Sequence, residues 1–265
     1  MKKNTVVLLA TSFVLVLVGS GVVVNQLNKE SKGSRKELRV GLEGTYAPFS
    51  YKDKSGKLVG YDVEVANAVA KKMGLKPVFV ETKFDSLAAG LDVGKYDVVY
   101  NDMTATKERE KHYRFGRPYL KSDAVMIVKK NSPIKTVNDL QGARAAQTTS
   151  SAYGQSALKY GAALISSPGF SETLDLVGSG KADVTLNSED AWITYQKKHQ
   201  TNKLKAIHTN ELEPILARPM FSKKHNDKEL EKQVSDAQVK LAQDGTLKRL
   251  SNKYFGKDLT RQIGE

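Results

Sequence analysis

Asn101-Asp102-Met103-Thr104-Ala105-Thr106-Lys107-Glu108-Arg109 is the stretch around which the rest of the chain is organised. It follows residues 96–100, a β-branched and aromatic run that predicts a buried strand. Thr106 is a candidate helix N-cap, because its hydroxyl can accept a hydrogen bond from the first turn. The stretch is therefore predicted to be the exit of a strand into the N-terminus of a helix.

A strand exit of this kind suits an anionic ligand. In open α/β sheets, ligands bind at the carboxyl ends of strands, and the free N–H groups of a helix N-terminus favour negative charge. Arg109 adds a guanidinium that can bind a carboxylate through two parallel hydrogen bonds. The alternative is that Arg109 pairs with Glu108 or Glu110 on a solvated helix, as charge runs usually do.

The pattern Gly-Lys-x-Asp-Val-x-x-Asn occurs twice, at residues 94–101 and again at residues 180–187. Each copy predicts a turn and a strand, followed by polar residues that lead into a helix. The repeat indicates two similar halves that bring polar strand ends to a common place. Chance recurrence of a common turn–strand pattern is the alternative.

The composition bounds the class of protein. A chain of 265 residues with 40% hydrophobic content, 8 Phe and 11 Tyr can form one large or two small folded domains, which argues against disorder. The absence of cysteine excludes disulfides, thiol catalysis, Cys-ligated zinc and a lipid-modified Cys. The four His residues show no metal-ligand spacing, so no metal and no cofactor are expected.

The net charge of +13 would fit nucleic-acid binding, but the lysines are scattered and no nucleic-acid motif is present. A basic surface protein attracted to anionic cell-wall polymer or lipid fits better. The start is positive, and residues 6–24 are uncharged and largely apolar, which predicts a signal peptide or a membrane anchor. Either predicts export to the extracellular face of the cell membrane, anchored or secreted, with residues 25–36 as a spacer.

The rest of the chain alternates strand and helix patterns, which predicts parallel sheets covered by helices. Asp62 and Ser171 are expected to cap helices, and a helical region over residues 228–254 should break near Gly245. A long strand over residues 123–128 is expected to carry the first crossing between lobes, and residues 216–221 the return. The predicted organisation is signal or anchor plus spacer at 1–36, lobe 1 at 37–125 and 217–265, and lobe 2 at 126–216.

Four motifs, in this order, resemble the extracellular solute-binding proteins of polar amino-acid ABC importers, over residues 37–255. They are Gly44-Thr45-Tyr46-Ala47-Pro48-Phe49, Gly60-Tyr61-Asp62-Val63-Glu64, Thr104-Ala105-Thr106-Lys107-Glu108-Arg109 and Phe115-Gly116-Arg117-Pro118-Tyr119. Residues 43–51 and 159–162 resemble the cystine-binding branch of that family. The resemblance implies a two-lobed α/β fold of the periplasmic-binding-protein type, with a mostly parallel sheet in each lobe. Two crossover strands would join the lobes, which close over a ligand held between them.

The resemblance also implies a ligand site. Arg109 would hold the ligand α-carboxylate, with the backbone of Asp102 and the hydroxyl of Thr104 beside it. Tyr46 and Phe84 would sandwich the apolar stem, although either ring could instead be ordinary core. The remaining members of the expected site are Glu43, which would approach the side chain or amine, then Asn101, Gln147, Thr148, Ser151, Asn187, Ser188 and Glu189.

One position departs from the family pattern. Many relatives place an Asp after the second-lobe strand to pair with the ligand ammonium, and here that position is Ser188. Because a buried ammonium without a counter-charge is costly, Glu189, Asp102 or Glu43 should supply a carboxylate. Gln147 replaces a basic residue of some relatives, which fits a neutral ligand.

The predicted function is the capture of a polar amino acid, with cystine favoured, and its delivery by a monomer to the membrane permease of an ABC importer. The alternatives are a cell-surface adhesion protein on the same fold and, less favoured, a dehydratase-type enzyme, since a fold does not fix a function. No catalytic constellation is apparent, so the chain is expected not to be an enzyme, and no nucleic-acid partner is expected.

Overall fold

Two five-stranded sheets carry the fold, in a computed structural model that describes residues 35–225 and 227–261. The predicted signal peptide or anchor and nearly all of the predicted spacer lie outside the described residues. Residues 36–265 form one compact unit, and the description below concerns that unit.

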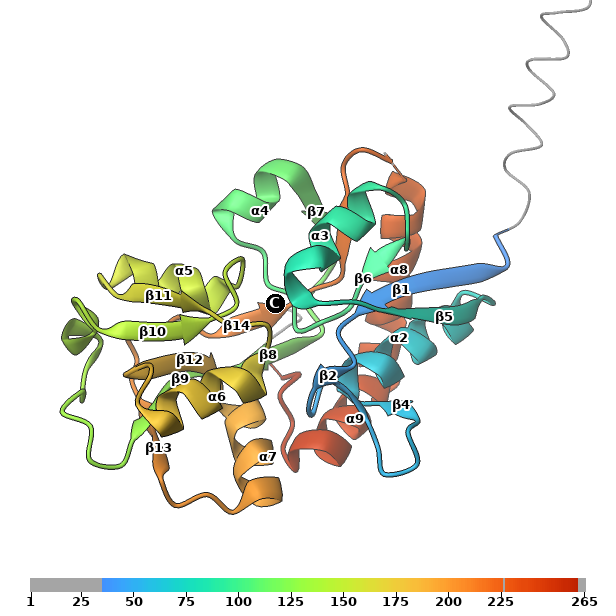
Figure 1. Cartoon of the computed structure of the whole chain (residues 1–265). Helices are drawn as coiled ribbons and strands as arrows, with labels where there is room; N and C mark the ends of the chain where they lie inside the picture. Colours follow the sequence, from blue (N-terminus) through green and yellow to red (C-terminus); the bar gives the residue numbers. More distant parts are fainter. Residues whose placement is uncertain (1–34, 226, 262–265) are drawn as a thin grey trace, which may run out of the picture. The chain divides into compact units, whose positions relative to one another are not determined.

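The first sheet has the order β5-β1-β6-β15-β7; Figure 1 labels its strands β1, β5, β6 and β7. Its first three strands are parallel, and the last two run antiparallel to their neighbours. The strands are β1 (Glu37–Leu42), β5 (Lys76–Glu81), β6 (Val98–Val99), β7 (Tyr113–Phe115) and β15 (Met220–Ser222). A small antiparallel sheet follows β1 and consists of β2 (Thr45–Tyr46), β3 (Ser50–Lys52) and β4 (Leu58–Val59).

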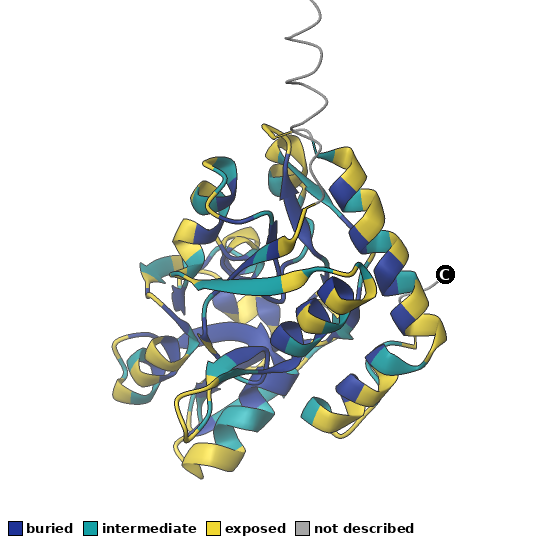
Figure 2. Cartoon of the chain, turned by 90° about the vertical axis from the view of Figure 1, so that its right-hand side faces the viewer, coloured by how far each residue is buried: buried dark blue, intermediate teal, exposed yellow. Residues whose placement is uncertain are grey.

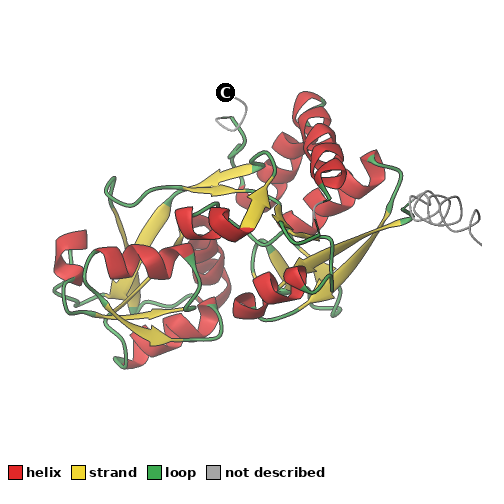
Figure 3. Cartoon of the chain, turned by 90° about the horizontal axis from the view of Figure 1, so that it is seen from above, coloured by secondary structure: helices red, strands yellow, loops and turns green. Residues whose placement is uncertain are grey.

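Helices cover both faces of the first sheet because its side chains alternate (Figure 3). Val98 packs with α2 (Tyr61–Lys72), α8 (Lys228–Gln243) and α9 (Thr246–Phe255), whereas Val99 packs with α3 (Phe84–Asp92). The apolar residues of α8 recur at helical spacing and form one buried face, as the burial colours of Figure 2 show; they are Leu230, Val234, Ala237 and Leu241. Gly245, at φ 75°, separates α8 from α9 where the sequence predicted a break.

The second sheet repeats this plan with the order β11-β10-β12-β9-β13, in which β11, β10 and β12 are parallel. One face packs against α5 and the 3₁₀ helix η1, and the other against α6 and α7. The elements are β9 (Ala124–Lys129), η1 (Val137–Leu140), β10 (Arg144–Gln147), α5 (Ala152–Lys159), β11 (Ala163–Ser166), α6 (Phe170–Ser179), β12 (Val184–Ser188), α7 (Glu189–His199) and β13 (Leu204–His208).

The sequence repeat has a structural basis in the first sheet. The backbone N–H of Arg39 donates to Asp97 Oδ2 over 2.8 Å, and its guanidinium donates to Asp97 Oδ1 over 2.6 Å. The same guanidinium donates to the carbonyl of Gly94 over 2.8 Å. This arrangement ties the start of β1 to the turn that precedes β6.

The second sheet contains the same arrangement. The backbone N–H of Arg144 donates to Asp183 Oδ2 over 2.8 Å, and its guanidinium donates to Asp183 Oδ1 over 2.7 Å and to the carbonyl of Gly180 over 2.9 Å. Gly94 and Gly180 both have positive φ, 70° and 80°, which glycine adopts without strain. The two halves are therefore alike in their local contacts, as the repeated pattern predicted.

A two-stranded antiparallel sheet, β8 (Leu120–Ser122) and β14 (Ile215–Ala217), joins the two halves. The predicted long strand over residues 123–128 corresponds to β9, which pairs entirely within the second sheet. The predicted return strand is divided into β14 and β15 by Arg218 and Pro219. The lobe boundaries at residues 125/126 and 216/217 remain predictions, and the sheet order favours placing both in the β8–β14 pair.

Two predicted helix caps are wrong. The N-cap of α2 is Gly60 and that of α6 is Gly169, so Asp62 and Ser171 lie in the first turns of their helices. Asp62 forms long-range hydrogen bonds instead, which the short-range capping pattern could not show. In the described part of the chain, no helix has both the length and the apolarity required to cross a membrane.

Candidate ligand-binding site

A cavity lies where residues of the two halves meet. Nine of the residues expected from the sequence line it: Glu43, Tyr46, Phe84, Asn101, Asp102, Thr104, Thr148, Ser151 and Asn187. Ala152, Tyr153, Phe170 and Ile215 complete the wall. Its mixture of aromatic rings and a few polar groups is typical of small-molecule sites.

The α4 helix (Lys107–His112) begins as the sequence predicted, with the Thr106 hydroxyl accepting a hydrogen bond from Arg109 N over 3.2 Å. The Arg109 guanidinium donates to the carbonyls of Thr104 and Ser150, both over 2.9 Å, and lies 5.7 Å from the centre of the Phe84 ring. Burial lowers the pKa of Arg109 to about 10.

Arg109 does not line the cavity itself, but it contacts two residues that do, Thr104 and Phe84. Among the described residues, its N–H groups bond only to the two backbone carbonyls, and no carboxylate forms an ion pair with it. The alternative that Arg109 pairs with a neighbouring Glu is therefore wrong: Glu108 contacts Lys111 and His112 instead. A guanidinium whose remaining N–H groups are free can donate hydrogen bonds to a carboxylate.

Glu43 is held by a two-point contact with Asn101. The backbone N–H of Glu43 donates to Asn101 Oδ1, and Asn101 Nδ2 donates to Glu43 Oε2, each over 2.8 Å. Burial raises the pKa of Glu43 to about 7, against the opposing effect of the Asn101 hydrogen bond. Asn101 thus connects the end of β6 to the loop after β1.

Asp62 fixes the backbone at the exit of β6. Its carboxylate accepts hydrogen bonds from the backbone N–H of Asp102 over 2.7 Å and from the Tyr119 hydroxyl over 2.8 Å. Burial raises the pKa of Asp62 to about 7, although both hydrogen bonds oppose the shift. Asp102 is held at φ 47°, a left-handed conformation that Asp tolerates better than most residues.

The side chain of Asp102 is only 9% exposed and lines the cavity. Both carboxylate oxygens are buried, and among the described residues neither has a hydrogen-bond partner. Burial raises the pKa of Asp102 well above its usual value, and the negative charges of Asp62 and Asp190 raise it further, against the opposing effect of the nearby Tyr46 hydroxyl, whose hydrogen bond goes to Asn187. Because buried polar groups are almost always hydrogen-bonded, this carboxylate requires an explanation.

Direct contacts connect the two halves around the cavity. The Tyr46 hydroxyl donates to Asn187 Oδ1 over 2.6 Å, and the Phe170 ring packs edge-on against Tyr46 at 6.2 Å between centroids. The Ser150 hydroxyl donates to Asp85 Oδ1 over 2.6 Å. These contacts give the cavity the arrangement of a closed cleft.

Gln147 and Ser188, which were also expected in the site, do not line the cavity. Gln147 Nε2 is directed into its own sheet, towards Thr185 Oγ1 at 3.3 Å and the Leu186 carbonyl at 3.2 Å. Ser188 is the N-cap of α7 and accepts hydrogen bonds from the backbone N–H groups of the first turn. Both side chains therefore support the local structure of the second sheet.

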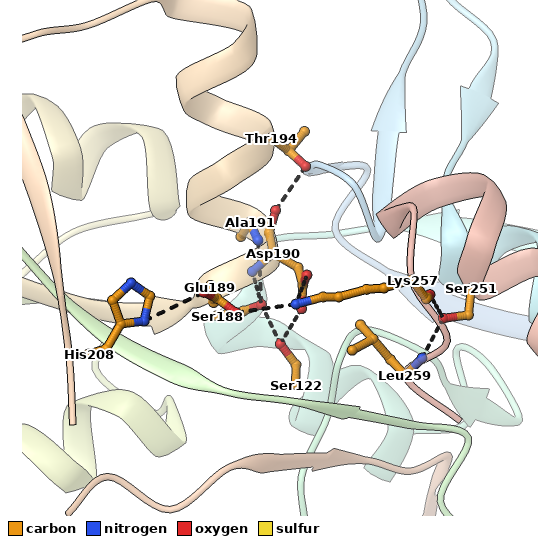
Figure 4. A network of polar contacts seen from close by, with 10 residues as sticks. All are labelled: Ser122, Ser188, Glu189, Asp190, Ala191, Thr194, His208, Ser251, Lys257 and Leu259. Carbon is orange, nitrogen blue, oxygen red and sulfur yellow. Dashed lines mark hydrogen bonds and ion pairs between the residues drawn. The ribbon is translucent and has the colours of Figure 1, made fainter. Parts of the chain in front are cut away.

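Glu189 also lies outside the cavity wall, in a separate polar network (Figure 4). Its carboxylate lies 3.2 Å from Lys257 Nζ and 3.5 Å from His208 Nδ1. The neighbouring Asp190 is 3.2 Å from the same Lys257 nitrogen and accepts a hydrogen bond from the Ser122 hydroxyl. The sequence could not show this network, because Lys257 is 68 residues away from Glu189.

Tyr153 and Phe170 are the functional candidates that the sequence reasoning missed. The Tyr153 hydroxyl is buried without a partner among the described residues, and it lines the same cavity as Asp102. Both aromatic residues lie in the first turn of a helix that follows a strand of the second sheet. The rule that placed Arg109 at a strand-to-helix exit could have identified them. Among the described residues, no cluster of three or more His, Asp or Glu side chains could hold a metal ion.

Comparisons with known proteins agree with this geometry. The family described as bacterial extracellular solute-binding proteins, family 3, matches residues 38–257. A probable amino-acid ABC transporter-binding protein of Haemophilus influenzae is 39% identical over 227 residues, which cover 85% of this chain and 87% of that protein.

Two solved structures are informative about the arrangement of the halves. The L-cystine solute receptor of Neisseria gonorrhoeae, in its unliganded open conformation, is 40% identical with a TM-score of 0.58, covering 88% of this chain and 98% of that one. An ancestral arginine-binding protein bound to arginine is 32% identical with a TM-score of 0.77, covering 84% and 99%. Because the less identical, ligand-bound structure matches better, the arrangement here resembles that of a ligand-bound protein.

Proposed function

The chain belongs to the family of bacterial extracellular solute-binding proteins, family 3, and we propose that it captures a polar amino acid for an ABC importer. The observation that carries the proposal is the cavity: a buried carboxylate lies on its wall, and the nearby Arg109 guanidinium, which contacts Thr104 and Phe84 of that wall, has no acidic partner among the described residues. These groups complement the two charges of an amino-acid zwitterion. Relatives that serve amino-acid transport support the same assignment.

L-Cystine is the leading candidate ligand. The similar receptor from Neisseria gonorrhoeae is named for cystine. Among the residues that the structure describes, two acidic side chains, Glu43 and Asp102, line the cavity, and no Lys or Arg does. Each of the two ammonium groups of cystine could face one of these carboxylates, and Arg109 would bind one of its two carboxylates. An amino acid with a cationic side chain would fit this charge distribution as well, and L-arginine is the comparison ligand.

The proposal extends to location and partners. The protein would act at the extracellular face of the membrane, anchored or secreted, as a monomer that passes its ligand to the importer permease. Its net charge of +13 would add an electrostatic attraction to anionic cell wall. If so, binding to isolated wall polymer should disappear as salt is raised, whereas ligand binding should change little.

The direct test is isothermal titration of the full chain, freed of bound ligand by unfolding and refolding, with a panel of amino acids that includes L-cystine and L-arginine. Saturable heat and a raised melting temperature with at least one polar amino acid are expected. Mass spectrometry should recover the ligand unchanged, since the proposed role involves no catalysis. A panel without heat or melting shift would overturn the proposal, and turnover of the ligand would favour the enzymatic alternative.

A further inference from the structure

Among the three candidates for an ammonium counter-charge, only Asp102 combines a place on the cavity wall with an unpartnered carboxylate. Glu43 lines the cavity, but its carboxylate accepts a hydrogen bond from Asn101. Glu189 lies off the wall and contacts Lys257 and His208. Asp102 is buried to nine-tenths, and both of its carboxylate oxygens lack partners among the described residues.

We propose that Asp102 binds the ammonium of the ligand's amino-acid group, so that one segment of the first lobe, residues 102–109, holds both of its charges. The inference rests on the proposed function and identifies the group that selects an amino acid over the corresponding acid. Arg109 would bind the carboxylate from the far end of the same segment. The second lobe would then enclose a zwitterion that the first lobe already holds.

The backbone of the first lobe is arranged for this role. Asp62 accepts the N–H of Asp102 over 2.7 Å and thereby stabilises the φ of 47° at that residue. A non-glycine residue in this conformation is uncommon, and such residues concentrate at binding sites that are held by surrounding structure. The contact uses only the backbone of Asp102, so its carboxylate remains available on the cavity wall.

The second lobe offers no equivalent charge at the matching strand end. Ser188 follows Asn187 as Asp102 follows Asn101, but its hydroxyl caps α7 and contacts Ser122 Oγ at 2.7 Å. The acidic residues that come next, Glu189 and Asp190, each lie 3.2 Å from Lys257 Nζ; Figure 4 draws this network. The second-lobe residues on the cavity wall are uncharged: Thr148, Ser151, Ala152, Tyr153, Phe170, Asn187 and Ile215.

The position of Asp102 also explains why the closed cleft would be more stable with ligand bound than without it. A buried carboxylate without a counter-charge or hydrogen bond is strongly unfavourable, and it must either take up a proton or find a cation. A ligand ammonium provides that cation at the moment the second lobe closes. Asp102 thus links recognition of the ammonium to closure of the cleft. A ligand with a carboxylate but no ammonium would leave the buried carboxylate of Asp102 without a counter-charge.

The test combines a substitution of Asp102 with removal of the amino groups from the ligand. Asp102→Asn removes the charge, keeps the shape and tolerates the left-handed backbone. The probes are L-cystine and 3,3′-dithiodipropionate, which is cystine without its two amino groups, with L-arginine and 5-guanidinopentanoate as a second pair. Wild type and variant are titrated calorimetrically with all four, and Glu189→Gln is the matched control outside the cavity.

The expected result is that Asp102→Asn weakens binding of the amino acid about 100-fold, as loss of a buried charged partner implies, and leaves its desamino analogue unchanged or tighter. Glu189→Gln should alter neither ligand by more than about threefold. The ligand-free Asp102→Asn protein should melt at a higher temperature, because the unpartnered carboxylate is gone.

The outcomes separate the two proposals. If wild type binds neither cystine nor arginine, nor any other amino acid of the panel, the proposed function fails and the inference falls with it. If wild type binds an amino acid but Asp102→Asn weakens it by less than threefold, or weakens the desamino analogue equally, only the Asp102 inference is overturned. If Glu189→Gln instead weakens binding of the amino acid strongly and leaves its desamino analogue unchanged, the ammonium is bound by Glu189 and the Asp102 inference is overturned.

Discussion

Strands β6 and β12 are each preceded by the same set of contacts between a glycine, an arginine and an aspartate. Each is also associated with an asparagine, Asn101 or Asn187, but the residue after that asparagine differs. In the first half it is Asp102, whose carboxylate lies unpartnered on the cavity wall. In the second half it is Ser188, whose hydroxyl caps the next helix. The common contacts therefore fix the turn that precedes each strand, whereas the residue after the asparagine decides whether the other end of the strand recognises a charge or supports a helix.

The two asparagines show the same division. Asn101 holds Glu43 through both its amide oxygen and its amide nitrogen. Asn187 accepts the Tyr46 hydroxyl from the other half and the backbone N–H of Ser188. One asparagine therefore organises the first-lobe charges, and the other connects the halves in the closed arrangement.

The largest effect is expected at Arg109. Arg109→Ala should reduce amino-acid affinity below detection while the fold persists, because two charge-assisted hydrogen bonds of roughly 1.5–3 kcal/mol each would be lost. Titration calorimetry measures the affinity, and circular dichroism checks the fold. Arg144→Ala, in the second half and outside the cavity wall, is the matched control. Affinity within a few-fold of wild type would show that the carboxylate lies elsewhere.

The second effect is a pH dependence of stability that arises from the raised pKa of Glu43 in the first half. Glu43 has a pKa of about 7 in the folded protein, so folding favours its protonated form and its contribution to stability declines as pH rises. We expect the free energy of unfolding of ligand-free wild type, relative to Glu43→Gln, to fall by roughly 3 kcal/mol between pH 4.5 and 7.

Urea unfolding at several pH values measures this difference. Asp85 and Glu172 also raise the pKa of Glu43, so their substitution by Asn and Gln should shift the transition to lower pH. A difference between wild type and Glu43→Gln that is constant with pH would contradict the expectation.

The smallest effect compares the two arginine–aspartate contacts. Asp97 is 7% exposed and Asp183 is 38% exposed, so the first-half contact is shielded more from solvent. Arg39→Met should lower stability by about 1–2 kcal/mol, since the guanidinium is itself partly exposed, and Arg144→Met by less. Urea unfolding of both variants, at low and high salt, gives the comparison. A larger loss in Arg144→Met would mean that burial does not determine the ranking.

Much of the local structure could be predicted from the sequence. The Thr106 cap, the break at Gly245 and the two Gly-Lys-x-Asp-Val strands are present because each depends on residues a few positions apart. The same local logic identified the strand exit at residues 101–109 as a place for ligand chemistry. Local rules failed at Asp62, because its expected capping role was replaced by bonds to Asp102 and Tyr119.

The sequence by itself determined the alternation of strands and helices, the repeat of its two halves and the residue types at the strand ends, because hydrophobic period and turn chemistry act over short distances. Only the tertiary structure decided which polar side chains face the cavity. Gln147 turned into its own sheet, Glu189 paired with Lys257, and Phe170 came to lie against Tyr46. These outcomes depend on the path of the chain between distant residues, and so does the isolation of the carboxylate of Asp102 on the cavity wall.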